Sequence, residues 1–414
     1  MHSPYSYDAC DKKGWVDGKL NKECLQNLKL GLCEDRIDYV FLTDHPSHMQ
    51  EFEMEDLLLS DLNDQIILKN GAPYANRIGS CSNSFTPTVL VGFEGKILAM
   101  GMTKHLDPDS QVRTSLYGQD SADLRNRLST ETEALVFVPH TESKTLEWIH
   151  ALQPDGIEIY NFHANIDPKI RKSDLKLPPF LNIPALLTYL IDPYEQLNPD
   201  FAFLNFLETS PLYSEKWNSL IDSGLKVVGV GGTDSHENAF PQQVADDERF
   251  DSHRRIMRMM SNHVLVATSE PDEVKSAIKA GHSWVVFEGL GTPANMDFYA
   301  NIGASTVGVG DTASLNGEYV TLVVQLPTLH IQSPHGDNKP TIRLKLKKVL
   351  SDGKDEVVAH TEGEDIRFST SEPGAYRAEI TIIPSHLREF LGTFVDQADQ
   401  EYRWITTNHI YLNP

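Results

Sequence analysis

A regular alternation of short apolar runs and polar, helix-like stretches extends from Asp38 to about Glu288. Five of the apolar runs have the length and content of buried strands: Asp38–Thr43, Thr88–Gly92, Ala134–Pro139, Gly156–Tyr160 and Lys226–Gly231. Five other segments have the pattern of helices: Asn21–Leu32, Asp120–Ser129, Ser143–Leu152, Ser214–Ser223 and Pro271–Ala280. Such an alternation is typical of parallel βαβ units, so it predicts a doubly wound sheet or a β/α barrel.

Two long segments interrupt the alternation, and a different pattern follows it. Residues 46–86 are acidic at first and then rich in turn residues, and residues 163–213 carry many Pro and Leu. Long segments like these often form lids over a site. After Gly291 the chain reads as short alternating strands separated by turns, which is typical of an all-β sandwich. We therefore predict two domains, residues 1–290 with the two insertions and a β-sandwich over residues 297–414.

The charge balance limits the partners. The 414 residues include 36 Lys and Arg against 59 Asp and Glu, which gives a formal net charge of −23. A surface this acidic repels phosphate backbones, so we expect no nucleic-acid partner. The sequence lacks the run of about 18 apolar residues that a membrane-spanning helix needs, so we expect no transmembrane segment.

The four cysteines, Cys10, Cys24, Cys33 and Cys81, contain no C-x-x-C pair, which argues against a zinc ribbon. They fit either four reduced thiols or one or two disulfides in an oxidising compartment, and their number does not separate these readings. Localisation stays open for the same reason. We expect an extracytoplasmic protein if a signal sequence preceded Met1, and a cytoplasmic one otherwise.

Polar residues follow the predicted strands where each strand ends. They are Thr43-Asp44-His45, Glu94, His140, Asn161 with His163, and Thr233-Asp234-Ser235-His236. Active sites of β/α folds assemble at the carboxyl ends of the strands. Charged residues are rarely buried without partners, so core packing does not account for five successive strands that end in this way. The pattern therefore predicts a metal or catalytic site.

Together with His2 and Asp8, these residues resemble the motif series of the PHP (polymerase and histidinol phosphatase) family, over roughly residues 1–290. The resemblance implies a distorted seven-stranded β/α barrel that holds two or three divalent ions of zinc, manganese or iron. The family motif begins with His-x-His, whereas this sequence begins with Met1 at the middle position, directly before His2. Either the first His and its strand are absent, or Met1 is an internal residue of a longer chain.

The resemblance also assigns roles to individual residues. It implies that the metal ligands are His2, Asp8, His45, Glu94, His140, Asp234 and His236. Glu94 would bridge two ions, Asp234 would bind the ion shared with His2, and Asp44 would orient a ligand or the attacking water. These three would be the catalytic residues. A further family His after the bridging Glu has only a weak counterpart here, His105. The segment 262–287 and the β-rich part resemble the branch of carbaryl-hydrolase-type metallohydrolases.

Such ligands predict hydrolysis, because two neighbouring cations lower the pKa of a bridging water toward neutrality. We expect a phosphoesterase that acts on a small molecule, with a carboxyl- or carbamate-ester hydrolase as the first alternative. A degenerate barrel that only binds ligands or partners is the second alternative. Weak candidates for substrate binding are Arg77, Lys96, His163, Arg254 and Arg255. The sequence does not indicate a partner for the β-sandwich.

Overall fold

The structure, a computed structural model, describes residues 1–191, 198–331, 333–334 and 336–414. Residues 192–197 of the predicted insertion 163–213, and residues 332 and 335 of the predicted sandwich, lie outside the described residues.

Contacts divide the chain into two compact units. The first unit comprises Met1–Glu158 and Thr233–Arg258, and the second comprises Ile159–Gly232 and Met259–Pro414. These units are not the predicted sequence domains, because residues 159–232 and 259–290 group with the C-terminal part of the chain. The division at about residue 290 stays a prediction.

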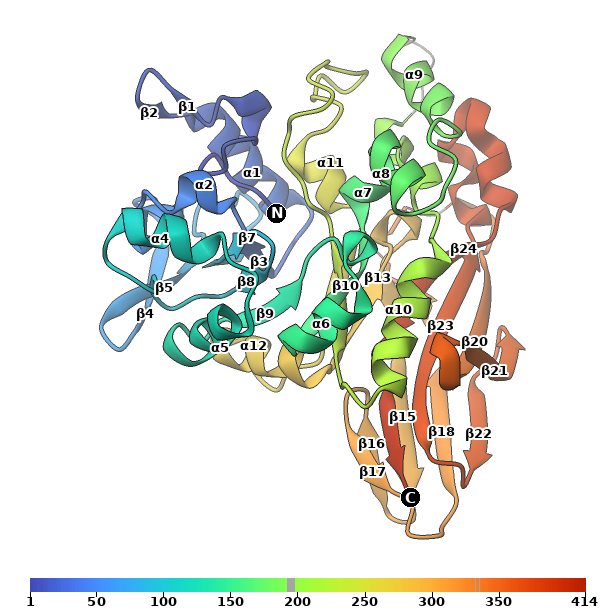
Figure 1. Ribbon diagram of the computed structural model, residues 1–414. Helices are drawn as coiled ribbons and strands as arrows, with labels where there is room; N and C mark the ends of the chain where they lie inside the picture. The colour runs from blue at the N-terminus through green and yellow to red at the C-terminus, as the bar shows by residue number, and fades with distance from the viewer. Residues whose placement is uncertain (192–197, 332, 335) are drawn as a thin grey trace. The chain divides into compact units, whose positions relative to one another are not determined.

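The first unit is mixed α/β. Its strands are β1 (Trp15–Val16), β2 (Lys19–Leu20), β3 (Tyr39–Leu42), β4 (Gln65–Lys69), β5 (Ala72–Arg77), β6 (Thr88–Val91), β7 (Phe93–Glu94), β8 (Leu98–Met100), β9 (Leu135–Val138) and the start of β10 (Gly156–Asn161). Its α-helices are α1 (Lys22–Glu34), α2 (Pro46–Met49), α3 (Met54–Leu57), α4 (Ser110–Tyr117), α5 (Ala122–Glu131), α6 (Leu146–Leu152) and α11 (His253–Met257). In Figure 1 the N-terminus lies beside β3 and β7.

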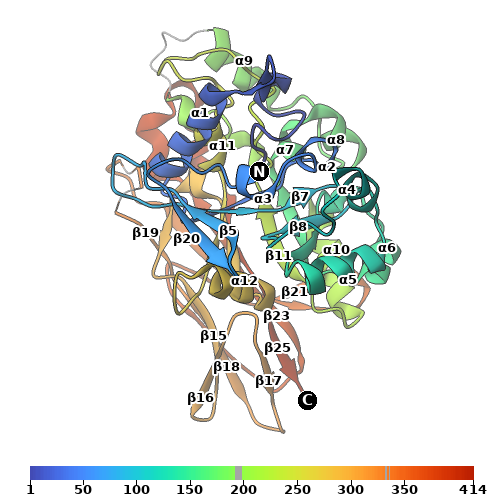
Figure 2. The same ribbon diagram turned by 90° about the vertical axis from the view of Figure 1, so that its left-hand side faces the viewer.

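Two sheets organise this unit. In one sheet β3 pairs with β6 in parallel, and the antiparallel hairpin β4–β5 extends the sheet beyond β6 (Figure 2). In the other sheet β7, β8 and β9 are antiparallel neighbours, and β9 pairs with β10 in parallel. Gly92 joins β6 to β7, and a Cβ at this position would overlap the carbonyl oxygen of Ala99. A residue without a side chain therefore lets one continuous segment serve both sheets.

The mixed α/β class is confirmed, but the seven-stranded barrel is not found. Within the described ranges, the paired strands form open sheets and close no ring. The insertion 46–86 forms the hairpin β4–β5, and β5 pairs with β6. In a barrel, the following parallel strand would pair with that edge of β6. The antiparallel strand β8 also breaks the parallel order on the other side.

The second unit is rich in β-structure. Its further strands are β11 (Val228–Gly232), β12 (Ser261–Val264), β13 (Ser283–Val286), β14 (Pro293–Ala294), β15 (Asp297–Ile302), β16 (Ser305–Gly308), β17 (Thr312–Ser314), β18 (Val320–Gln325), β19 (Thr328–Leu329), β20 (Thr341–Val349), β21 (Asp355–Glu362), β22 (Ile366–Thr370), β23 (Gly374–Ile383), β24 (Tyr402–Thr407) and β25 (Ile410–Asn413). Its α-helices are α7 (Phe162–Ile166), α8 (Pro168–Ser173), α9 (Ile183–Ile191), α10 (Pro211–Asp222) and α12 (Pro271–Ala280).

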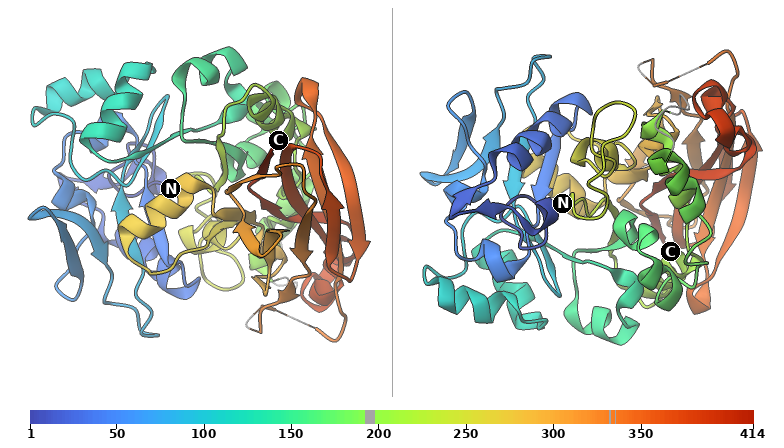
Figure 3. Two further views of the ribbon diagram at one scale, coloured as in Figure 1. Left: turned by 90° about the horizontal axis from the view of Figure 1, so that it is seen from below. Right: turned by 90° about the horizontal axis from the view of Figure 1, so that it is seen from above.

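One eight-stranded sheet has the order β12-β13-β24-β23-β20-β21, with β25 paired to β23 and β17 paired to β25, and a four-stranded sheet has the order β16-β15-β18-β22. Figure 3 shows the strands of the larger sheet side by side in one curved layer. β12 and β13 belong to the predicted first domain, yet β13 pairs with β24, so this sheet crosses the predicted boundary. Besides the short pair β14–β19, the strand pairing defines these two large sheets, and a sandwich of the two stays a prediction.

Both disulfides lie in the first unit, where Cys10 is bonded to Cys24 and Cys33 to Cys81. Cys24 and Cys33 are both in α1, so the two bonds tie this helix to the N-terminal segment and to the segment after β5. The cysteines therefore form two disulfides, and the alternative of four reduced thiols is wrong. None of the helices in the described part of the chain is long and apolar enough to cross a bilayer.

Candidate metal centre

The N-terminal segment lies against two parts of the chain that are distant in the sequence. The N–H of Thr43, directly after β3, donates to the carbonyl of Met1 at 2.8 Å. The N–H of His2 donates to the carbonyl of Ser235 at 3.0 Å. These two bonds hold His2 between the end of β3 and the segment that contains Asp234.

Seven predicted ligands of the first unit meet in one place, which we call the histidine–carboxylate cluster: His2, Asp8, His45, Glu94, His140, Asp234 and His236. Ligand atoms of His2, Asp8, His45 and His236 all lie within 4.8 Å of one another. The same holds for His2, Glu94 and Asp234. His2 belongs to both groups, so the cluster offers two adjoining sets of ligands.

In each of the four histidines the Nε2 atom faces a carboxylate. Nε2 of His2 lies 3.0 Å from Asp234 Oδ1 and 3.4 Å from Glu94 Oε2. Nε2 of His140 lies 3.4 Å from both Glu94 Oε1 and Asp234 Oδ2. For the other two histidines the facing atom is Asp8 Oδ2, at 3.2 Å from His45 and 3.4 Å from His236.

In the same four histidines the Nδ1 atom is held by another protein atom. The partners are Ser6 Oγ for His2 (3.1 Å), the Glu94 carbonyl for His45 (2.8 Å), Glu142 Oε1 for His140 (2.8 Å) and the Asp234 carbonyl for His236 (2.7 Å). A ring that donates from Nδ1 to such an acceptor presents the lone pair of Nε2. This arrangement orients the histidine ligands of metal ions in proteins.

The spacing of these atoms fits divalent cations. Ligands lie about 2.0–2.2 Å from a zinc ion, so two ligands of one ion are at most about 4.4 Å apart. The contacts between Nε2 and carboxylate oxygen in the cluster measure 3.0–3.4 Å. Imidazole nitrogens together with carboxylate oxygens suit zinc, manganese and iron.

Electrostatics favour a cation at this position. Burial would raise the pKa of Asp8, but hydrogen bonds from His236 and His45 hold that pKa well below its usual range. Burial and the Asp234 carboxylate would likewise raise the pKa of Glu94, but His140 and His2 lower it. Burial alone would lower the pKa of His2, yet its hydrogen bonds to Asp234 and Glu94 raise it to about 9. Asp8 and Glu94 are therefore ionised and are balanced by a proton on His2, which a divalent cation can replace.

Two of the ligands have backbone conformations that L-residues rarely adopt. The φ angle is 47° at His140 and 52° at Asp234. Left-handed backbone costs a non-glycine residue roughly 1–3 kcal/mol and concentrates at functional sites. The fold therefore keeps these two side chains in the cluster against a local energetic preference.

Asp44 lies against the N-terminal segment that carries His2. Its Oδ2 accepts a hydrogen bond from Ser3 Oγ at 2.7 Å, and its Oδ1 accepts one from the N–H of Ser3. The side chain is buried. Asp44 thus anchors the residue next to His2 and positions that ligand.

Three polar residues beside the cluster were missed in the sequence. Ser6 Oγ donates to Asp8 Oδ1 at 2.7 Å, and Glu142 accepts from the ring of His140. Glu158 Oε2 accepts from the backbone N–H of His140 at 2.7 Å, and burial raises the pKa of this carboxyl to about 8. Ser6 and Glu142 each lie within four residues of a ligand, and only that proximity in the sequence could have indicated them.

The weaker candidates make their contacts elsewhere. Both ring nitrogens of His105 have protein partners, the Tyr117 hydroxyl at 2.9 Å and the Phe52 carbonyl at 3.0 Å. Burial and the charge of Arg113 lower the pKa of His105 to about 4. His105 therefore directs neither nitrogen at the cluster.

The cationic candidates also have other environments. Lys96 pairs with Asp120 at 3.1 Å on the surface, Arg254 pairs with Glu248, and Arg77 is the last residue of β5. Arg255 is fully buried and pairs with Asp246 at 3.0 Å. His163 lies in α7 of the second unit, and its role in substrate binding stays a prediction.

Comparisons with known proteins add little. No protein-family model and no curated protein matches the chain. A solved structure that does match is a two-domain protein from Bacteroides vulgatus containing a predicted PHP-like metal-dependent phosphoesterase. It is 13% identical, the match covers 97% of this chain and 92% of that one, and the TM-score is 0.33. A likeness at this level assigns neither a fold nor a function, and nothing found supports the carbaryl-hydrolase branch.

Proposed function

We propose that this chain is a divalent-metal-dependent hydrolase of the PHP type that acts as a phosphoesterase on a small phosphorylated molecule. One observation carries the proposal. Four histidines have Nδ1 held by the protein and Nε2 directed at the buried Glu94 and Asp234 or at the half-buried Asp8, and metal-binding histidines in proteins are oriented in this way.

The two carboxylates at the centre of the cluster suit a site for two ions. Glu94 faces His2 with Oε2 and His140 with Oε1, and Asp234 faces the same two histidines with Oδ1 and Oδ2. A carboxylate that presents its two oxygens to different ligands can be shared by neighbouring ions. Divalent ions, when bound, would lower the pKa of a coordinated water and polarise an ester oxygen.

The other side chains keep this arrangement in place. Glu142 fixes the ring of His140, Ser6 connects the ring of His2 to Asp8, and Asp44 anchors the segment that carries His2. Zinc, manganese and iron remain the candidate ions, because the ligands combine imidazole nitrogen with carboxylate oxygen.

The experiment compares p-nitrophenyl phosphate with p-nitrophenyl acetate, each with and without added Mn²⁺ or Zn²⁺. We expect metal-dependent hydrolysis of the phosphate ester that is lost in His45→Ala and kept in His150→Ala, a matched control at an exposed position of α6. Preferential hydrolysis of the acetate would favour the carboxyl- or carbamate-ester alternative. Metal binding without hydrolysis of either ester would favour the non-catalytic alternative.

A further inference from the structure

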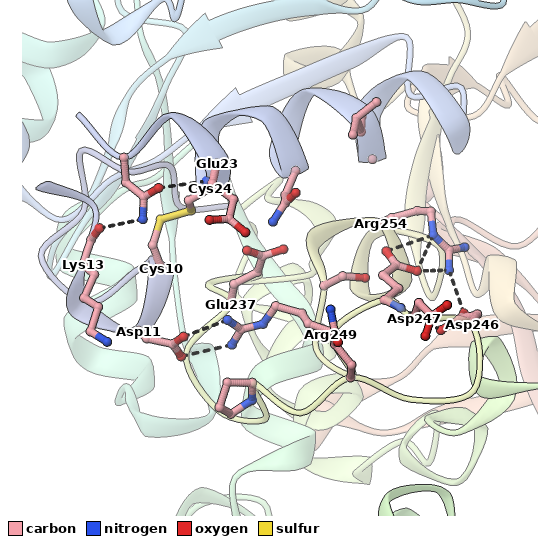
Figure 4. Close-up of a pocket in the computed structure, with 18 of the residues that line it drawn as sticks. Cys10, Asp11, Lys13, Glu23, Cys24, Glu237, Asp246, Asp247, Arg249 and Arg254 are labelled. Carbon is pink, nitrogen blue, oxygen red and sulfur yellow. Dashed lines mark hydrogen bonds and ion pairs between the residues drawn. A yellow bond between two sulfur atoms is a disulfide. The ribbon is translucent and has the colours of Figure 1, made fainter. Parts of the chain in front are cut away.

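A pocket of about 920 Å³ lies beside α1 and the segment that follows His236 (Figure 4). Its wall includes the Cys10–Cys24 disulfide and Glu237, which lie next to each other in the close-up. Acidic lining residues outnumber basic ones by seven to three, so the pocket favours cations over anions. None of the ligands of the histidine–carboxylate cluster lines it.

A buried histidine lies next to Cys24 and Glu237 but outside the pocket lining, and one of its ring nitrogens makes no hydrogen bond with the described residues. His253 is fully buried, and its Nδ1 is hydrogen-bonded to Ser235 Oγ at 2.9 Å. Among the described residues its Nε2 has no hydrogen-bond partner. A buried polar atom of this kind is rare and calls for an explanation.

His253 belongs to a set of three metal-binding residues. Ligand atoms of Cys24, Glu237 and His253 all lie within 4.8 Å of one another, and all three residues are buried. The backbone N–H of His253 donates to Glu237 Oε1 at 3.0 Å, which orients the carboxylate. Burial lowers the pKa of His253 to about 3, so the ring is the neutral imidazole that a metal ion requires.

In the disulfide, the sulfur of Cys24 is bonded to Cys10 and carries no charge, whereas a thiolate is a strong ligand for zinc. We propose that reduction of the Cys10–Cys24 bond creates a second metal site, in which Cys24, Glu237 and His253 bind a thiophilic divalent cation such as zinc. Three protein ligands leave a fourth position for water, and the pocket supplies the access route.

Reduction of the Cys10–Cys24 bond and the metal binding that follows it conserve electrons and protons. A dithiol reductant gives two electrons to the S–S bond, becomes a disulfide itself, and leaves thiols on Cys10 and Cys24. Binding of the cation then releases the proton of the Cys24 thiol to solvent. Reoxidation would expel the cation, since the sulfur would again be shared with Cys10.

The variant Cys10→Ser tests this without a reductant, because it leaves Cys24 as a free thiol. Cobalt(II) is the probe, since a thiolate ligand produces a charge-transfer band in the near ultraviolet and the histidine–carboxylate cluster contains no sulfur. We expect the band in Cys10→Ser when cobalt is added beyond the two equivalents that the histidine–carboxylate cluster can take, its absence in the oxidised wild type, and its loss in the double variant Cys10→Ser/His253→Ala.

The matched control is Cys24→Ser, which leaves Cys10 free instead and should give no band. A folded Cys10→Ser protein with a titratable thiol and no band would overturn the proposal, and so would an equal band in Cys24→Ser. If Cys10→Ser does not fold, the test passes to Cys33→Ser/Cys81→Ser protein treated with a phosphine reductant, in which only the Cys10–Cys24 bond remains to be opened. We then expect the cobalt band after reduction and not before it. A reduced, folded protein without the band, or an equal band before reduction, would overturn the proposal.

Discussion

Replacing Glu142 by Ala should weaken metal binding although Glu142 is not a ligand. Its Oε1 accepts the hydrogen bond from His140 Nδ1 at 2.8 Å, and its side chain is only 1% exposed, so water cannot easily take its place. Loss of such a partner behind a histidine ligand typically costs about 10- to 100-fold in metal affinity. That factor corresponds to about 1.4–2.7 kcal/mol, similar to the roughly 1.5–3 kcal/mol of a hydrogen bond to a charged group.

The assay is a zinc titration in competition with a fluorescent chelator, with circular dichroism as the check on folding. Glu142→Gln is the matched control, since the amide oxygen can still accept from Nδ1, and we expect it to lose much less affinity than Glu142→Ala. The weakening should affect the ion near His140 more than the ion held by Asp8, His45 and His236. Equal zinc affinity in the wild type and in a folded Glu142→Ala protein would refute the reasoning.

Three further predictions follow from other contacts. Asp234→Ala should abolish hydrolysis and remove bound metal while the circular dichroism spectrum stays close to that of the wild type, and near-normal turnover would contradict the assignment of this ligand. Cys33→Ser/Cys81→Ser opens a link across a sequence separation of 48 residues, so the free energy of unfolding measured in denaturant should fall by about 4 kcal/mol; an unchanged value would count against a stabilising disulfide. The pKa of His253 is about 3 in the folded protein and 6.5 in the unfolded chain, so between these values only the unfolded chain binds the proton. The free energy of unfolding should therefore decrease as the pH falls below about 6.5, by up to about 1.4 kcal/mol per pH unit. His253→Gln should show a shallower decrease between about pH 6.5 and about pH 4, and identical pH profiles would argue against a buried neutral His253.

The sequence predicted local structure well where the pattern was strong. The helix expected over 271–280 has the same bounds as α12, where Pro271 opens the helix and Gly281, with φ of 78°, ends it. The apolar runs that precede His45, Glu94 and His140 are β3, β6 and β9, and Glu94 itself lies in the short strand β7. Short apolar runs with turn residues at both ends indicate buried strands, because they are too short for a typical helix and their side chains avoid water.

Long-range pairing was beyond the sequence. Nothing in the residues of 46–86 shows that β5 would pair with β6, yet this pairing keeps the sheet open. Four cysteines allow three connectivities, so the bonds Cys10–Cys24 and Cys33–Cys81 could not be selected either.

The candidate site shows the same limit. Residue type and position at strand ends indicated His45, Glu94, His140, Asp234 and His236, because histidine and carboxylate side chains are seldom buried together without a functional reason. His2 and Asp8 were predicted only through the resemblance to the PHP family. The residues that orient them, such as Glu142 and Ser6, are common polar residues with no distinguishing spacing. Charge alone also could not show that Lys96 pairs with Asp120 on the surface.

The central claim is that the histidine–carboxylate cluster holds divalent ions. The most direct test is the metal content of the protein purified without chelators, measured by inductively coupled plasma mass spectrometry on the wild type and on Asp234→Ala. The two adjoining ligand sets predict two equivalents of zinc, manganese or iron per chain in the wild type and a clear loss in the variant. A folded wild-type protein that contains no such metal and takes up none when it is supplied would contradict the account.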